Sequence, residues 1–121
     1  MSETETTVET DAPAAIDSEA LFSLLGRAHT LEILQEACLR SDQTVRFGDL
    51  QDELELSPNT LSRRLEELVE MGFLERNQYD EIPPRVEYEA TDRLRALRPT
   101  FQELQDWMRE YGAEPLYDPE A

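Results

Sequence analysis

The chain of 121 residues has room for one domain with a modest core, and it carries 28 acidic residues against 11 basic ones, a net charge of −17. All the basic residues are arginine, since lysine does not occur. A single cysteine excludes an internal disulfide or a multi-thiolate metal site, and no apolar run is long enough to span a membrane. We therefore expect a cytoplasmic protein.

The acidity is itself informative. An acidic chain without lysine is typical of adaptation to high salt, where dense negative charge is screened. The alternative is an acidic protein whose surface binds a partner. Residues 1–17 are expected to form a disordered acidic tail and residues 113–121 a short acidic one, because both segments lack basic residues and most large apolar ones. The folded domain is expected over residues 18–112.

Two helices are predicted first. One begins at a candidate cap, Ser18, and ends before Gly26. Its apolar residues are Leu21, Phe22, Leu24 and Leu25. The other is predicted over residues 28–39 from apolar side chains three and four positions apart. These are Leu31, Leu34 and Cys38, with Ile33 beside them.

A short strand (44–47) and a short helix (49–54) are predicted next, followed by a longer helix with clear ends. Ser57 can accept a hydrogen bond from the first turn of this helix, where the missing N–H of Pro58 costs nothing. Gly72 supplies a left-handed stop, with Phe73 folding back as the apolar contact. The buried stripe is formed by Leu61, Leu65 and Leu68.

After Gly72 the pattern alternates as in strands, which are predicted over residues 73–79 and 85–90. Two prolines, Pro83 and Pro84, stiffen the loop between them. Thr91 then caps a long helix over residues 92–111, which Pro99 is expected to bend. The apolar stripe of this helix consists of Leu94, Leu97, Phe101, Leu104 and Met108.

This order predicts a mainly α (α+β) fold, a winged helix-turn-helix with a two-stranded wing and a long C-terminal helix. In that fold the second helix of the pair enters the major groove and the wing reaches the adjacent backbone. With the leucine stripe inward, Asn59 and Arg63 face outward, and these side chains suit adenine and guanine edges. Residues 56–65 contain two arginines and no acid. The candidate DNA contacts are Ser57, Asn59, Thr60, Ser62, Arg63, Arg64, Arg76 and Arg85.

The alternative for this helix is that Arg63 and Arg64 form ordinary surface pairs with Glu67 and Glu66. At the level of function, the alternative is a winged-helix protein-interaction module of the transcription machinery that does not contact DNA. The two functions differ in where the positive charge lies. A DNA-binding domain should gather the four candidate arginines on one face.

The stretch from Leu24 to Trp107 resembles the HxlR family of MarR-like winged-helix regulators. The matching segments are Leu24–Gly26, Thr30–Leu34, Arg46–Leu50, Ser57–Leu65 and, most distinctively, Tyr79–Tyr88, followed by Thr91 and Trp107. The resemblance implies a transcriptional regulator that binds a two-fold site in double-stranded DNA as a homodimer built from the first and last helices. The implied interface residues are Leu21, Phe22, Leu97, Phe101, Leu104, Trp107 and Met108. In so small a chain this apolar stripe is expected to serve the core as well.

Two residues depart from the family. His29 stands where the family usually has tryptophan, and the redox cysteine that many members carry near the N-terminus is absent. Cys38 lies instead on an apolar stripe, where cysteine is usually inert rather than a thiol sensor. His29 is expected to be a hydrogen-bonded structural residue, with pH sensing or ligand contact as alternatives. With one histidine and no catalytic motif, we expect no enzyme, no metal and no cofactor, and the sequence identifies no effector ligand.

Overall fold

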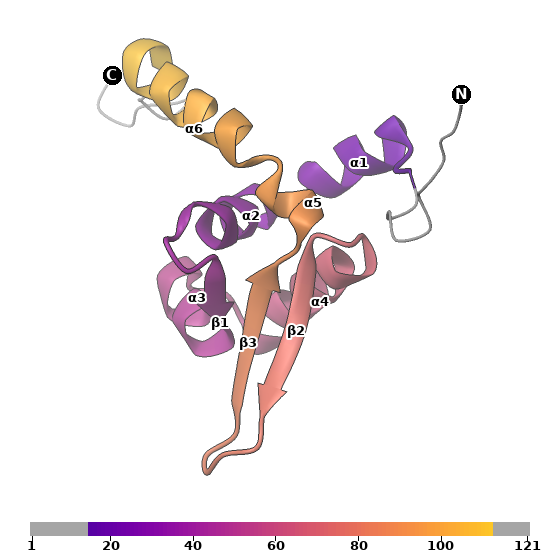
Figure 1. Cartoon of the computed structure of the whole chain (residues 1–121), viewed down its shortest axis with the longest axis vertical. Helices are drawn as coiled ribbons and strands as arrows, with labels where there is room; N and C mark the ends of the chain where they lie inside the picture. Colours follow the sequence, from indigo (N-terminus) through magenta and orange to yellow (C-terminus); the bar gives the residue numbers. More distant parts are fainter. Residues whose placement is uncertain (1–14, 113–121) are drawn as a thin grey trace, which may run out of the picture.

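The computed structural model describes residues 15–112 and has the element order of a winged helix-turn-helix (Figure 1). The predicted mixed α+β fold class is confirmed. The elements are α1 (Ser18–Leu25), α2 (Thr30–Leu39), β1 (Thr44–Arg46), α3 (Phe47–Leu54), α4 (Pro58–Glu70), β2 (Leu74–Tyr79), β3 (Arg85–Ala90), α5 (Asp92–Arg95), α6 (Arg98–Trp107) and a π-helical turn, η2 (Met108–Gly112). Of the two predicted tails, only residues 15–17 lie within the described range.

The cap of α1 is Asp17 rather than the predicted Ser18, which is the first helical residue. The Asp17 carboxylate accepts a hydrogen bond from the backbone N–H of Ala20 at 3.1 Å. Aspartate and serine are nearly equivalent caps, so sequence alone does not choose between neighbours. Ile16, just before the cap, packs against the core. The chain therefore contacts the domain before residue 18.

Both ends of α4 form as predicted. The Ser57 hydroxyl accepts from the Thr60 backbone N–H at 3.2 Å, and Pro58 is the first helical residue. At the other end Gly72 adopts a left-handed φ of 81°. The N–H of Phe73 then bonds the carbonyl of Leu68 at 2.9 Å, while Phe73 itself is buried. This pattern is a Schellman cap, and it sets the angle at which β2 leaves α4.

The wing is part of a three-stranded antiparallel sheet of order β1-β3-β2, so the predicted two-stranded wing gains β1 as a third strand. Val45 of β1 lies opposite Tyr88 of β3. Along β3, Tyr88 and Ala90 are buried and Val86 is half-buried, which matches the predicted alternation. Beyond β1 the hairpin continues as a two-stranded ribbon with its tip away from the body (Figure 1).

The C-terminal helix is broken, not merely bent as predicted. α5 ends at Arg95, and α6 starts at Arg98 with Pro99 in its first turn. The reason is that proline lacks an N–H and its ring clashes with the carbonyl four residues earlier, here that of Arg95. Leu94 is fully buried and Phe101 is 5% exposed, so both flanks of the break pack into the core.

The core lies between the helices and the sheet, and α2 contributes Ile33, Leu34, Ala37 and Cys38 to it. The prediction was wrong for Leu31, which is 37% exposed. Leu31 lies in the first turn of α2 on the same face as Cys38. Helical periodicity identifies the buried face but does not say how far along the helix its neighbours extend.

Candidate nucleic-acid interface

The outward face of α4 is set by its buried leucines. Leu61, Leu65 and Leu68 have no exposed surface. This burial turns Asn59, Ser62 and Arg63 to solvent, and Thr60 is half-buried. The Ser57 hydroxyl caps the helix and also donates to the Thr60 hydroxyl at 3.0 Å. The polar residues of the predicted recognition helix therefore share one accessible surface, while Ser57 and Thr60 satisfy each other.

The arginines separate into two groups by their contacts. All eleven lie within residues 15–112, and nine contact an acceptor of the chain. Those nine are Arg27, Arg40, Arg46, Arg64, Arg85, Arg93, Arg95, Arg98 and Arg109. Arg63 on α4 and Arg76 on β2 are exposed and contact no acceptor in the part of the chain that the structure describes.

The alternative pairing of Arg63 with Glu67 is not observed. The Glu67 carboxylate instead contacts Arg27 Nη1 at 2.5 Å and Arg64 Nη1 at 3.5 Å. Arg64 also donates from Nε to the carbonyl oxygen of Ala28 at 3.0 Å, and its side chain is only 17% exposed. Arg64 thus ties α4 to the α1–α2 connection, whereas Arg63 has an open guanidinium.

Arg85 at the base of the wing loop is likewise engaged. Its guanidinium lies 3.1 Å from Glu81 and 3.5 Å from Glu87, and its central carbon lies 4.2 Å from the centre of the Tyr79 ring. Of the four candidate arginines, Arg64 and Arg85 therefore form intramolecular links, whereas Arg63 and Arg76 contact no acceptor within residues 15–112.

A hollow separates α4 from the wing. It is lined by Ser62 and Glu66 of α4, by Arg76 of β2 and by the hairpin tip. Arg46 of β1 also lines it, 3.2 Å from Glu87, and was missed at the sequence level. The signal was the alternation along β1, where Val45 is buried and Arg46 therefore faces outward.

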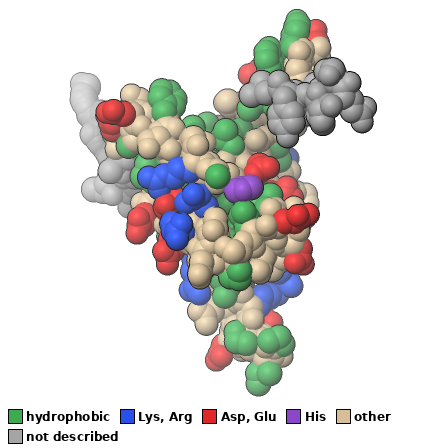
Figure 2. All heavy atoms as spheres, turned by 180° about the vertical axis from the view of Figure 1, so that it is seen from behind, with side chains coloured by type: hydrophobic (Ala, Val, Ile, Leu, Met, Phe, Trp, Pro, Cys, Tyr) green, Lys and Arg blue, Asp and Glu red, His purple; other side chains and the backbone are tan. Residues whose placement is uncertain are grey.

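The tip of the wing carries exposed apolar side chains. The Ile82 side chain is fully exposed, and Pro83 and Pro84 beside it are exposed as well. Figure 2 shows apolar side chains at this lower end of the molecule, and basic side chains gathered higher up beside the histidine. Asp80 and Glu81, just before Ile82, are exposed too, so the tip presents both hydrocarbon and negative charge.

At the end opposite the tip, α1 and α6 project from the body (Figure 1). They carry large exposed apolar side chains, among them Phe22 at 68% and Trp107 at 56%. Leu104 and Met108 are also exposed, and Leu21 and Leu97 are half-buried against the core. Tyr111, which the sequence analysis did not include, is 69% exposed, with its ring centre 5.8 Å from that of Trp107.

Cys38 and His29 are both in structural settings. The Cys38 thiol is completely buried and donates to the Leu94 carbonyl at 3.3 Å. Burial raises the pKa of this thiol, against a smaller opposing effect of Arg98. His29 has a left-handed φ of 70°, and its Nδ1 lies 2.9 Å from the carboxylate of Glu32.

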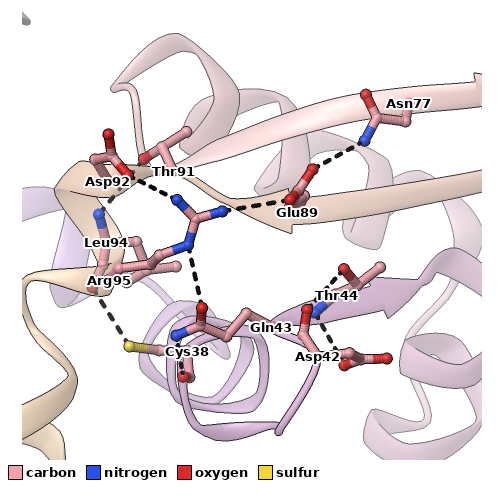
Figure 3. Close-up of polar contacts among 10 residues, drawn as sticks. All are labelled: Cys38, Asp42, Gln43, Thr44, Asn77, Glu89, Thr91, Asp92, Leu94 and Arg95. Atoms are coloured by element: carbon pink, nitrogen blue, oxygen red, sulfur yellow. Dashed lines mark hydrogen bonds and ion pairs between the residues drawn. The ribbon is translucent and has the colours of Figure 1, made fainter.

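A polar network around Arg95 joins the C-terminal helices to the wing (Figure 3). Arg95 donates to Gln43 at 3.1 Å and pairs with Asp92 at 2.7 Å and Glu89 at 3.3 Å. Asn77 of β2 donates to the other oxygen of Glu89 at 3.4 Å. The arginine therefore connects α5 to both strands of the hairpin.

Between residues 15 and 112 there is no cluster of side chains suited to a metal ion. Over the same range, no helix has the length and apolar character needed to cross a membrane.

Comparison with known proteins gives a consistent result. Residues 24–115 match the family model of HxlR-like helix-turn-helix proteins. An HTH-type transcriptional regulator of Halalkalibacterium halodurans is 36% identical over 87 residues, which are 71% of this chain and 75% of the relative. One from Mycobacterium tuberculosis is 39% identical over 94 residues, 78% of this chain but 58% of the relative. The solved structure of the reduced transcriptional regulator YodB from Bacillus subtilis has a TM-score of 0.61 and 31% identity, and the match covers 77% of this chain and 89% of YodB.

Proposed function

The chain belongs to the HxlR-like helix-turn-helix family and is a DNA-binding transcriptional regulator, and we propose that it binds a two-fold site in double-stranded DNA as a homodimer. In this proposal α4 enters the major groove and the β2–β3 wing lies over the adjacent backbone. The arrangement of arginines carries the proposal. In a chain with a net charge of −17, the two arginines that contact no acceptor within residues 15–112 lie on α4 and β2, the elements that such a domain presents to DNA.

Each exposed residue of α4 has a proposed role that follows from its chemistry. Asn59 and Arg63 contact base edges, since an amide suits adenine and a guanidinium suits guanine. Ser62 and Arg76 contact phosphate oxygens, which position the protein without specifying sequence. Arg64 and Arg85 are paired within the chain, so we assign them to holding α4 and the wing in place.

The homodimer is proposed to form through α1, α6 and η2. Phe22, Leu104, Trp107 and Met108 remain exposed in the single chain, although burying large apolar side chains is favourable. Phe101 lies in the core and supports this face from beneath. A two-fold dimer gives two copies of α4 and therefore two half-sites, spaced by about 10–20 base pairs.

The test is fluorescence anisotropy with the DNA upstream of the gene for this chain against a scrambled duplex, in molar KCl. Arg63→Ala is expected to lower affinity for the specific duplex about tenfold or more, as for loss of a bidentate base contact. Arg40→Ala is the matched control because it removes the same charge from the end of α2, where Arg40 pairs with Glu36. Folding of each variant is checked by circular dichroism.

Selective binding that is lost in Arg63→Ala and kept in Arg40→Ala supports the proposal. If the upstream DNA gives no selective binding, a selection from random duplexes follows. A selection that yields no preferred sequence overturns the proposal and favours a module that docks to protein.

A further inference from the structure

One acidic residue on α4 makes contacts that its neighbours do not. The Glu67 side chain is 20% exposed, and its two oxygens contact different arginines, Arg27 at 2.5 Å and Arg64 at 3.5 Å. Arg27 lies outside α4, in the connection between α1 and α2. Glu66, one residue earlier, is exposed and contacts no cation within residues 15–112.

These contacts hold the middle of α4 against the α1–α2 connection. Arg27 reaches Glu67 from that connection, and Arg64 returns from α4 to the carbonyl of Ala28 at 3.0 Å. Charged hydrogen bonds from two directions fix the position of a helix more firmly than a single pair does. We call this arrangement, formed by Arg27, Ala28, Arg64 and Glu67, the α4 clamp.

The clamp also keeps Glu67 from pairing with Arg63. A glutamate four residues after an arginine on a helix is spaced to pair with it. Glu67 stands in that position relative to Arg63 but is occupied by Arg27 and Arg64 instead. Removing Arg27 therefore leaves one oxygen of the Glu67 carboxylate without its arginine partner, and that oxygen becomes available to Arg63.

We propose that Glu67 is a positioning residue for DNA binding, which acts through Arg27 and Arg64 to orient α4 and to keep the Arg63 guanidinium open. The inference rests on the proposed function. It predicts an effect of unusual sign, because removing an acid close to a DNA-binding surface ordinarily raises affinity for the polyanion. At Glu67 the loss of position outweighs the gain in charge.

The experiment compares Glu67→Gln with Glu66→Gln, two substitutions one residue apart that each remove one negative charge. Affinities for the specific and the scrambled duplex are measured by anisotropy, and thermal unfolding monitors the fold. Glu66→Gln is expected to raise both affinities alike. Glu67→Gln is expected to lower affinity for the specific duplex about fivefold, in the range of couplings between contacting charged residues, and so to lower the ratio of specific to scrambled binding.

Arg27→Gln, with Arg40→Gln as its charge-matched control, is the second test and applies even where Glu67→Gln fails to fold. Arg27→Gln should reduce the specific-to-scrambled ratio, and Arg40→Gln should not. The inference is overturned if Glu67→Gln raises affinity as Glu66→Gln does, or if the two arginine variants behave alike. Because the wild-type chain must first show selective binding, failure of the proposed function appears separately, as no selectivity before any substitution.

Discussion

The salt dependence of DNA binding can be predicted from the contacts of the arginines. Each phosphate contact by a cation releases counterions, so log K falls with log [salt] by about 0.9 per contact. Only Arg63 and Arg76 lack an internal acceptor within the described range, which gives four open cations in a dimer. The expected slope is therefore no steeper than about −3.6, whereas contact by all the arginines of both protomers would give about −20.

The acidic residues of the chain make the slope shallower. Its repulsion from phosphate weakens as salt screens it, so added KCl removes an unfavourable contribution while counterion release removes a favourable one. Binding should consequently survive in molar KCl better than the number of arginines suggests. We expect base contacts, packing and hydration to supply the affinity that remains.

The assay is anisotropy on the specific duplex over 0.2–2 M KCl with three variants. Arg63→Ala and Arg76→Ala should each make the slope shallower by about 1.8 per dimer where the removed charge contacts phosphate, and by less where it contacts a base. Arg85→Ala should leave the slope unchanged, because its charge is already paired with Glu81 and Glu87. A wild-type slope steeper than about −6, or a change in Arg85→Ala as large as in Arg76→Ala, would refute the reasoning.

Three further predictions concern the wing, the exposed apolar face and the thiol. Ile82→Ala should alter the free energy of unfolding by less than about 0.5 kcal/mol, since the side chain is fully exposed. It should still weaken binding to a duplex that is long enough to pass beneath the wing. An equal loss of affinity for a shorter duplex would argue against contact between the tip and DNA. Trp107→Asp should convert the proposed dimer to a monomer, as measured by light scattering. A molecular mass equal to that of the wild-type dimer would exclude the face of α1, α6 and η2 as the dimer interface. Burial raises the pKa of Cys38, so its stabilising contribution is complete below the unfolded pKa of about 8.5 and lost as pH rises through the folded pKa. Urea unfolding at pH 7.5 and 10 gives the free energy of unfolding of the wild type and of Cys38→Ala. The wild type should exceed the variant by less at pH 10 than at pH 7.5, and an excess that does not change with pH would contradict a raised pKa for Cys38.

The sequence was sufficient where structure depends on adjacent residues. The ends of α4 follow from the side chain of Ser57, the ring of Pro58 and the freedom of Gly72 at positive φ. Its buried face follows from leucines at helical spacing. For the same reason the outward position of Asn59 and Arg63 could be predicted without a structure.

Sequence spacing did not determine the partners of the charged groups. Arg63 and Glu67 are spaced to pair, but Arg27, which lies far earlier in the chain, occupies the carboxylate. Glu87, within the strand predicted over residues 85–90, contacts both Arg46 and Arg85. Such outcomes depend on which elements pack together, and helical or strand periodicity carries no information about that.

The restriction to arginine acquires a structural interpretation beside the high-salt one. Arg64, Arg85, Arg95 and Arg98 each contact two or more acceptors, and for Arg64 and Arg98 these include backbone carbonyls distant in the sequence. A planar guanidinium with five donors can make such links, whereas an ammonium group acts as a point charge. Arg64 links α4 to the α1–α2 connection, Arg98 links α6 to the end of α2, and Arg95 links α5 to the sheet, so these guanidinium groups are engaged within the fold. Within residues 15–112 the arginines that contact no acceptor are Arg63 on α4 and Arg76 on β2, so the charge left open for phosphate lies on the two elements proposed to meet DNA.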